Sequence, residues 1–361
     1  MTLTNPLPEK AESFSCTYTE MIPDLLMQLN CTLAISTYQA GKLILLSPKK
    51  GGGLVQLPRT FPKPMGIALD PTGNKLALAC KDEVVVFANS PELGMHYPGK
   101  PGVYDSFYLP RQTFHTGPLD IHDLTWGGNR LYAVNTLFSC IVTFDDAYSF
   151  TPYWKPSFIT EIKPEDRCHL NGMAMENEKP RYATAFGKFN EKQGWKNNIG
   201  KGGLLIDVAS NEILLDDLPM PHSPRIINGK LFLLFSATGE LAIADPENHR
   251  YEVIAKIDGF VRGMDHCGDY LFICLSKQRK QSSSTGKLII GETANTAGVT
   301  VLHLPSGRVA GHIRYEDSVE EIYDIRVLHN KKRPNILNTS TPDHRYSIAL
   351  PGDSFWAKEK D

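Results

Sequence analysis

Long hydrophobic runs are missing from this 361-residue sequence. No stretch approaches the roughly 18 apolar residues that a membrane-spanning helix needs. The opening segment, "MTLTNPLPEKAESFSC", is polar and has neither the basic start nor the apolar centre of a secretory signal. We therefore expect a cytoplasmic protein that has no membrane partner.

An excess of charge of either sign is also missing. The chain has 38 basic and 40 acidic residues, with a formal net charge of -2. Proteins that bind nucleic acids carry a basic surface, and this composition gives no sign of one. We expect no nucleic-acid partner.

Clustered cysteines are the third absence. The seven cysteines are an odd number at scattered spacings, and no two of them form a Cys-x-x-Cys pair. This excludes a disulfide framework and a zinc-ribbon signature. Most lie in apolar runs such as "LALAC" and "LFICL", where a free cysteine behaves as a small hydrophobic residue. We therefore expect unpaired, structural thiols.

Helical periodicity is almost absent. The main helix candidate lies within "TEMIPDLLMQLN", residues 19–30, and its proline allows only a short helix. Elsewhere the sequence consists of short apolar or alternating runs that are broken by Gly, Asn, Asp and Pro. These patterns predict an all-β protein.

A weak repeat organises these runs. Each unit has a polar start, a short apolar strand, a turn and a second apolar strand, and the spacing of the starts is about that of a four-stranded propeller blade. The six units begin at Lys63, Asp120, His169, His222, Phe260 and Glu321.

The last unit runs out of chain after its second strand, which leaves a blade incomplete. The segments "TLAISTYQAGKLILLSP" and "GGGLVQLP", near the N-terminus, can supply the missing outer strands and so leave no open sheet edge. We predict a single six-bladed β-propeller over residues 16–337, closed by N-terminal strands. Residues 1–15 and 338–361 are expected to be tails.

The repeat also predicts which side chains meet at the channel mouth, because the innermost strand of each propeller blade begins near the axis. The six starts form one expected ring. Residues two places further on face the same way and form a second ring, made of Met65, His122, Asn171, Pro224, Arg262 and Tyr323. A concave site lined by so many polar groups is a candidate binding site.

Three histidines, His122, His169 and His222, are the main candidates for chemistry. With Asp120 they could bind one divalent metal ion, because imidazole and carboxylate both suit zinc, iron and manganese. Without metal, the same histidines and Glu321 could act as general acids and bases. No compact motif such as H-E-x-x-H chooses between these, and the histidines could also simply hydrogen-bond water and neighbouring strands.

Other polar residues suit substrate binding. Arginine grips carboxylates and phosphates with two hydrogen bonds, so we expect Arg262 and Arg225 to bind an anion. An ion pair between Arg262 and Glu320 is the structural alternative. Two long loops, residues 187–203 and 276–298, open on the same face and could form a lid. The expected substrate-binding residues are Lys63, Asn171, Arg225, Arg262 and Tyr323.

Six phrases carry a family resemblance: "HLNGMAM", "IHDLTW", "MPHSPR", "VRGM", "VEEIYDIRVL" and "STYQAGKL". Together they closely resemble a family of bacterial conserved hypothetical proteins, a domain of unknown function, over roughly residues 16–336. At the level of fold, "HLNGMAM" is also similar to the strand-start motif of six-bladed calcium-dependent propellers related to gluconolactonase and strictosidine synthase. In the lactonases a glutamate, asparagines and an aspartate bind the metal. Only Asn171 matches that set, and histidines stand in place of other ligands.

Two classes of function follow. The first is a propeller that binds a small polar or anionic molecule and acts on it as a hydrolase, lyase or isomerase, with or without one divalent metal ion. The second is a non-catalytic propeller that grips a protein or peptide partner. The tryptophans are scattered along the chain rather than gathered, which favours the first.

Overall fold

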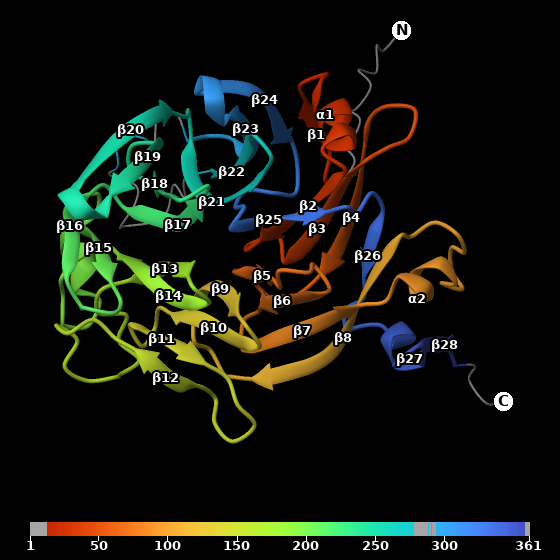
Figure 1. Cartoon of the computed structure of the whole chain (residues 1–361), viewed down its shortest axis with the longest axis horizontal. Coiled ribbons are helices and arrows are strands. Elements are labelled where there is room, and N and C mark those ends of the chain that lie inside the picture. The colour runs from red at the N-terminus through yellow and green to blue at the C-terminus, as the bar shows by residue number, and fades with distance from the viewer. Residues whose placement is uncertain (1–12, 278–287, 289, 291–293, 358–361) are drawn as a thin grey trace, which may run out of the picture.

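The computed structural model describes residues 13–277, 288, 290 and 294–357. Six sheets of four or five strands, with antiparallel pairing throughout the blades, are arranged around a central axis (Figure 1). The prediction of an all-β, six-bladed propeller is confirmed. No helix in the described residues is long and apolar enough to span a membrane.

Blades 2 to 6 follow the chain in order from the innermost to the outermost strand. Blade 2 contains β5 (Ile67–Leu69), β6 (Lys75–Ala79), β7 (Glu83–Asn89) and β8 (Ser106–His115). Blade 3 contains β9 (Ile121–Gly127), β10 (Arg130–Asn135), β11 (Cys140–Thr143) and β12 (Thr151–Trp154). Blade 4 contains β13 (Leu170–Glu176), β14 (Lys179–Ala185), β15 (Gly203–Asp207) and β16 (Ile213–Leu218).

The next two blades repeat this pattern. Blade 5 contains β17 (Pro221–Ile227), β18 (Lys230–Phe235), β19 (Glu240–Asp245) and β20 (Arg250–Lys256). Blade 6 contains β21 (Phe260–Cys267), β22 (Tyr270–Ser276), β23 (Ala297–His303) and β24 (Arg308–Tyr315). The six predicted unit starts lie within four residues of the beginning of an innermost strand, so the sequence repeat is the blade repeat.

Blade 1 joins the two ends of the sequence. Its innermost strand is β25 (Asp324–His329), and its outer strands are β2 (Cys31–Thr37), β3 (Lys42–Pro48) and β4 (Leu54–Thr60). The predicted closure by N-terminal strands is confirmed.

The prediction that the last unit adds its second strand to this blade is wrong. That strand, β26 (Pro334–Ile336), pairs in parallel with β8 at the outer edge of blade 2, because β2 already occupies the place beside β25. At the other end of the chain, β1 (Cys16–Tyr18) pairs with β24 at the outer edge of blade 6. Both flanking segments therefore cover sheet edges that would otherwise be open.

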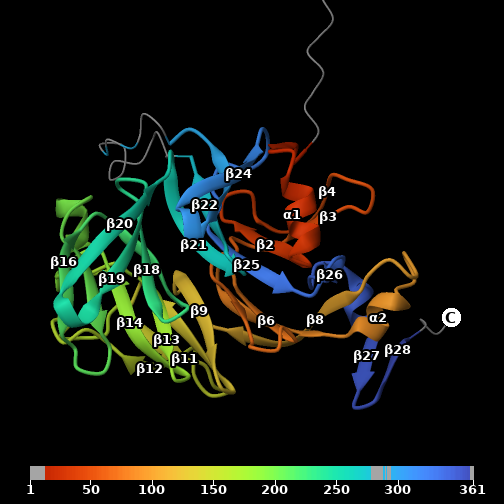
Figure 2. The ribbon, with the colours of Figure 1, turned by 45° about the horizontal axis from the view of Figure 1, so that its top comes forward.

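The two α-helices of the described residues lie outside the ring. The expected short helix is α1 (Ile22–Gln28), which buries its apolar side chains against blades 1 and 6. Near the C-terminus, β27 (Ser347–Leu350) and β28 (Asp353–Trp356) form a hairpin beside α2 (Pro91–Met95) (Figure 2). The Trp356 indole donates a hydrogen bond of 2.9 Å to the Leu93 carbonyl. The segment expected to be a C-terminal tail thus contains a hairpin that packs on blade 2.

Glycines let the innermost strands approach one another closely at the axis. A Cβ atom on Gly66 would lie 3.0 Å from the Cα of Asp123, and one on Gly263 would lie 2.6 Å from the Cα of Asp324. On Gly172 a Cβ would lie 2.5 Å from a ring carbon of the next blade's inner strand. The channel is therefore narrow below its mouth.

Hydroxyl groups near the end of the second strand also join neighbouring blades. Each one donates to a backbone carbonyl at the start of the next blade. The four donor and acceptor pairs are Ser36 to Met65, Thr136 to Leu170, Ser236 to Val261 and Ser276 to Ile322, at 2.5–2.8 Å. This repeated contact holds the strand starts, and the side chains they carry, in place around the mouth.

Candidate functional site

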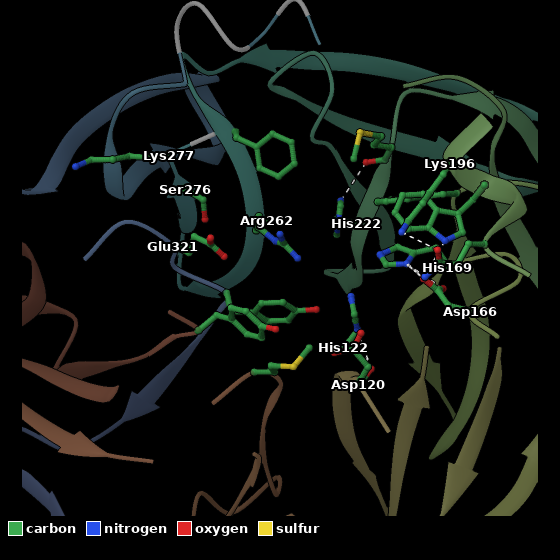
Figure 3. A pocket seen from close by; sticks show the side chains of 18 residues that line it. Asp120, His122, Asp166, His169, Lys196, His222, Arg262, Ser276, Lys277 and Glu321 are labelled. Atoms are coloured by element: carbon green, nitrogen blue, oxygen red, sulfur yellow. Dashed lines mark hydrogen bonds and ion pairs between the residues drawn. The ribbon is translucent and has the colours of Figure 1, made fainter. Parts of the chain in front are cut away.

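A cavity of about 380 Å³ lies at the mouth of the channel, where the innermost strands begin. Aromatic and methionine side chains form much of its wall. Figure 3 shows the three histidines on one side of the cavity, with Arg262 and Glu321 across from them. The predicted residues that line it are Asp120, His122, His169, His222, Arg262, Glu321 and Tyr323.

Three other predicted residues lie elsewhere. Lys63 is exposed at the rim, with its Nζ atom 5.5 Å from the ring centre of Tyr38, which lines the cavity. Asn171 and Arg225 lie below the cavity, deeper in the channel. The Asn171 side-chain oxygen accepts a hydrogen bond of 2.7 Å from Thr184.

His122 and His222 occupy the same position in their blades. The Nδ1 atom of His122 lies 2.9 Å from the carbonyl oxygen of Asp120, and that of His222 lies 3.2 Å from the carbonyl oxygen of Met220. In both cases the carbonyl belongs to the residue two places earlier, which has a positive φ of 57° or 58°. The expected rings placed His222 beside Asp120, and that register is wrong by two residues.

These contacts define the tautomers of the two imidazoles. A carbonyl oxygen only accepts hydrogen bonds, so Nδ1 of each ring carries the proton. At His222 a second acceptor agrees with this, because the Ser236 hydroxyl donates its own proton to the Val261 carbonyl and lies 2.6 Å from Nδ1. In each neutral ring the other nitrogen, Nε2, is therefore a free base.

His169 has a carboxylate partner instead. Its Nδ1 atom lies 3.0 Å from both oxygens of Asp166, and the Trp195 indole donates to the same carboxylate at 2.9 Å. The imidazole also packs against Phe186 and Trp195, with ring centres 4.5 and 4.2 Å away. Asp166 thus orients the ring with Nε2 unprotonated and can stabilise its protonated form.

Burial lowers the pKa of two of the three histidines. It lowers the pKa of His122 to about 4, and Arg262 and His169 add to the effect. Burial and Arg262 also hold the pKa of His222 well below its usual value. Both imidazoles are therefore neutral at neutral pH, since a buried cation without a carboxylate partner is unfavourable. Only His169 has a carboxylate bonded to its ring.

Arg262 supplies positive charge to the cavity. Its guanidinium lies over the ring of Tyr323, 4.5 Å from the ring centre. Within the described residues no carboxylate forms an ion pair with it, so the alternative pair with Glu320 is not formed. Its Nε atom is buried and has no hydrogen-bond partner. A guanidinium in this setting suits an anionic ligand.

Arg225 forms a buried ion network below the cavity. Its guanidinium donates two hydrogen bonds to Asp123, at 2.9 and 3.1 Å. Arg326 lies 3.3 Å from the same carboxylate and 2.8 Å from Asp324. Two arginines and two aspartates therefore neutralise one another and fill the channel beneath the cavity. The predicted role of Arg225 in binding an anion has no support from this placement.

Comparison with known families gives a match to a domain of unknown function, DUF4915, over residues 20–337. The chain belongs to this family. No curated protein matches the sequence.

Solved structures show the fold alone. A chain of a nidogen/laminin complex is 11% identical, with a TM-score of 0.54 over 83% of this chain and 99% of that one. A protein of unknown function from Bacteroides caccae is 9% identical, with a TM-score of 0.50 over 82% of this chain and 98% of that one. At identities this low, the likeness supports the propeller architecture of the DUF4915 chain and carries no information about its activity.

Metal binding gains no support from the side-chain positions in this DUF4915 chain. Across the described residues, no group of three or more His, Cys, Asp or Glu side chains is arranged to hold a metal ion. The free Nε2 atoms are the form of imidazole that binds metals. Ligation by His122, His169, His222 and Asp120 therefore stays a prediction.

Sequence reasoning missed Asp166, whereas Trp195 was expected in the lid. A signal for Asp166 was present, because it lies three residues before His169, but "PEDRC" was not recognised as part of the unit start. Trp195 lies in the predicted lid, residues 187–203, whose short 3-10 helix (Gly194–Asn198) covers one side of the cavity.

The second predicted lid segment, residues 276–298, is described only in part. Ser276 and Lys277 line the cavity. Leu288, Ile290 and Ala294 pack in the same hydrophobic cluster as Trp195. The rest of this segment, residues 278–287, 289 and 291–293, lies outside the described residues.

Proposed function

We propose that this propeller is an enzyme that binds a small carboxylate- or phosphate-bearing molecule and moves a proton on it. His169 is the base, and the reaction class is isomerase or lyase. The observation that carries the proposal is the His169–Asp166 pair, in which both carboxylate oxygens lie 3.0 Å from Nδ1. The seven cysteines, all unpaired, support a reducing compartment such as the cytoplasm.

The division of labour follows from the environment of each ring. Nε2 of His169 accepts the proton, and Asp166 stabilises the imidazolium that results. His122 and His222 resist protonation because burial depresses the pKa of each. They accept hydrogen bonds from substrate hydroxyl groups and do not take up charge. The same proton, returned from His169 to a different atom, completes an isomerisation.

Arg262 holds the substrate anion. Its guanidinium faces the cavity from the side opposite the histidines (Figure 3). A bound carboxylate or phosphate would receive charge-assisted hydrogen bonds there, in a partly buried site where they are strong. The contact would also place the rest of the molecule against the Nε2 atoms.

Binding is tested with a thermal-shift and calorimetry screen of short 2-hydroxy and 2-oxo carboxylates and inorganic phosphate. We expect at least one of them to bind the wild type and the exposed control Arg308→Gln equally, and Arg262→Gln much more weakly. Equal binding by Arg262→Gln would overturn the assignment of the anion site.

Proton transfer is tested by proton NMR of the bound carboxylates in D2O. We expect deuterium to enter the carbon next to the carboxylate in the presence of the wild type. His169→Gln should lose this exchange, whereas the exposed control His115→Gln should keep it. Prior treatment with EDTA should leave the rate unchanged. A rate that is lost with EDTA and restored by zinc, iron or manganese would show instead that the chemistry is metal-assisted.

A further inference from the structure

A second group of reactive side chains lies at the end of the propeller opposite the cavity. Strand β21 begins at the cavity with Phe260 and ends at Cys267, and β25 ends at His329. Strand β2 runs antiparallel to β25 and begins at Cys31. The group therefore lies where blade 6 meets blade 1, at the closure of the ring.

Two contacts place the sulfur of Cys267 beside Cys31. It lies 3.5 Å from Nδ1 of His329 and 3.8 Å from the carbonyl oxygen of Leu29. His329 is directly opposite Cys31 in the strand ladder, and Leu29 precedes Cys31 by two residues. Both cysteines belong to one core cluster, and each shifts the pKa of the other.

The surroundings favour a thiolate at Cys267. The neighbouring Cys31 and His329 lower the pKa of Cys267, although burial acts in the opposite direction. The contact with Cys267 in turn raises the pKa of His329. His266 lies next to Cys267, with Nδ1 3.8 Å from Asp265, and also favours the thiolate. A thiolate beside an imidazolium is the reactive form of cysteine.

Another cysteine pair in the same chain provides a contrast. Cys140 and Cys168 interact across blades 3 and 4, but both are fully buried. Burial raises the pKa of each thiol to about 12. Cys267 is 7% exposed and borders the exposed His329. Both pairs therefore bring two cysteines together. Of the two, only the Cys31–Cys267 pair also has a basic partner and a route to solvent.

We propose that Cys31, Cys267 and His329 form a peroxide-reactive site, in which Cys267 is oxidised and Cys31 then closes a disulfide. The proposal concerns the face opposite the cavity and does not depend on the proposed enzymatic function.

The chemistry balances with hydrogen peroxide as the oxidant. The Cys267 thiolate attacks one peroxide oxygen, the O–O bond breaks, and the released hydroxide takes up a proton to leave as water. The Cys31 thiol then attacks the sulfenic acid at Cys267 and releases a second water. Two thiols and one peroxide become one disulfide and two waters, with two electrons transferred to the peroxide.

The disulfide would tie the N-terminal strands to the last blade. In the reduced protein, blade 1 is held closed by noncovalent contacts such as strand pairing and packing. A covalent bond between Cys31 in β2 and Cys267 in β21 would close a loop that contains most of the chain. It would therefore strongly restrict the conformations of the unfolded chain. We expect oxidation to raise the Tm of the full chain by roughly 5 °C.

The test treats the reduced full-length protein with one to five equivalents of hydrogen peroxide and maps its peptides without reduction. We expect a Cys31–Cys267 disulfide in the wild type and in the control Cys140→Ser. In Cys31→Ser, dimedone should trap a sulfenic acid at Cys267. Oxidation spread over several of the seven cysteines, or absence of this disulfide from the wild type, would overturn the proposal.

A second measurement does not depend on the folding of a cysteine variant. Iodoacetamide labelling of Cys267 against pH should have its midpoint well below that of an ordinary thiol in the wild type. His329→Asn replaces an exposed side chain, and we expect it to move this midpoint upward by at least one pH unit. An unchanged midpoint would show that the imidazole does not activate the thiol.

Discussion

Arg262 and Arg225 come from neighbouring innermost strands, β21 and β17, yet their surroundings differ completely. Arg225 donates to Asp123 from a buried position in the channel. Arg262, one level higher, contacts aromatic rings and forms no ion pair with any carboxylate in the described residues. The same repeat therefore provides a structural cation, Arg225, and a cation available to a ligand, Arg262. The difference is that Arg225 has a carboxylate within hydrogen-bonding distance.

The two levels of the channel thus have different tasks. In the lower level every charge is matched, and the aspartates also accept backbone hydrogen bonds from the neighbouring blade, as Asp123 does from Met173 at 3.1 Å. In the upper level two histidines are neutral, and Arg262 forms no ion pair with a carboxylate of the described residues, although Glu321 lines the same cavity. Matched charges hold the blades together, and the unmatched one is available to a ligand.

Removing one member of the lower network should have the largest effect. In Asp123→Ala, Arg225 loses the carboxylate it is hydrogen-bonded to and Arg326 keeps only Asp324, so we expect the free energy of unfolding to fall by about 3–5 kcal/mol. Arg262→Met, in the upper level, should change it by less than about 1 kcal/mol. Urea unfolding of both variants checks this. Similar losses in the two would erase the distinction between the levels.

Acidification should have the next largest effect, by lowering the free energy of unfolding through the histidines of the upper level. The pKa of His122 is about 4 in the folded protein, below its value of 6.5 in the unfolded chain. Between these values the unfolded chain binds the extra proton, so stability is complete above pH 6.5 and is lost as pH falls towards 4. We expect His122 to account for roughly 3 kcal/mol of this loss. Thermal unfolding against pH should show a shallower slope for His122→Gln, and an unchanged slope would contradict the burial argument.

Loss of the unmatched charge should affect binding rather than folding. For the best carboxylate or phosphate found by screening, we expect Arg262→Gln to raise the Kd by roughly 10- to 100-fold, as for a lost charge-assisted hydrogen bond. Arg262→Lys should recover only part of the affinity, because an ammonium cannot form the two-pronged contact. Calorimetry measures both, and full recovery by lysine would show that only the charge matters.

The smallest effect should come from the hydroxyl that orients His222. Ser236→Ala removes its bond to the Val261 carbonyl, and we expect a loss of about 1 kcal/mol in the free energy of unfolding. The variant should also weaken the preference of His222 for the Nδ1-protonated tautomer. Long-range proton–nitrogen NMR of the imidazoles detects this, with His122 as the internal control. An unchanged spectrum would mean that the Met220 carbonyl alone sets the tautomer.

Part of the site was predictable from the repeat. The spacing of the unit starts brought His122, His169 and His222 together, because equivalent positions of successive blades converge on the axis. The role of Arg225 was not predictable, since its partner Asp123 lies two blades away and is brought near only by ring closure. The register of His222 was also wrong, because a positive φ at Met220, not visible in the letters, sets its direction.

The amino-acid sequence by itself determined that this is an all-β propeller with six blades closed by N-terminal strands. Alternating apolar residues and turn residues are local signals, and their recurrence reports the blade count. The tertiary structure alone decided which polar side chains are paired, which imidazole meets Asp166, and which cysteine lies beside His329. Those outcomes depend on distances between residues far apart in the chain, and on the burial that shifts the pKa of each one.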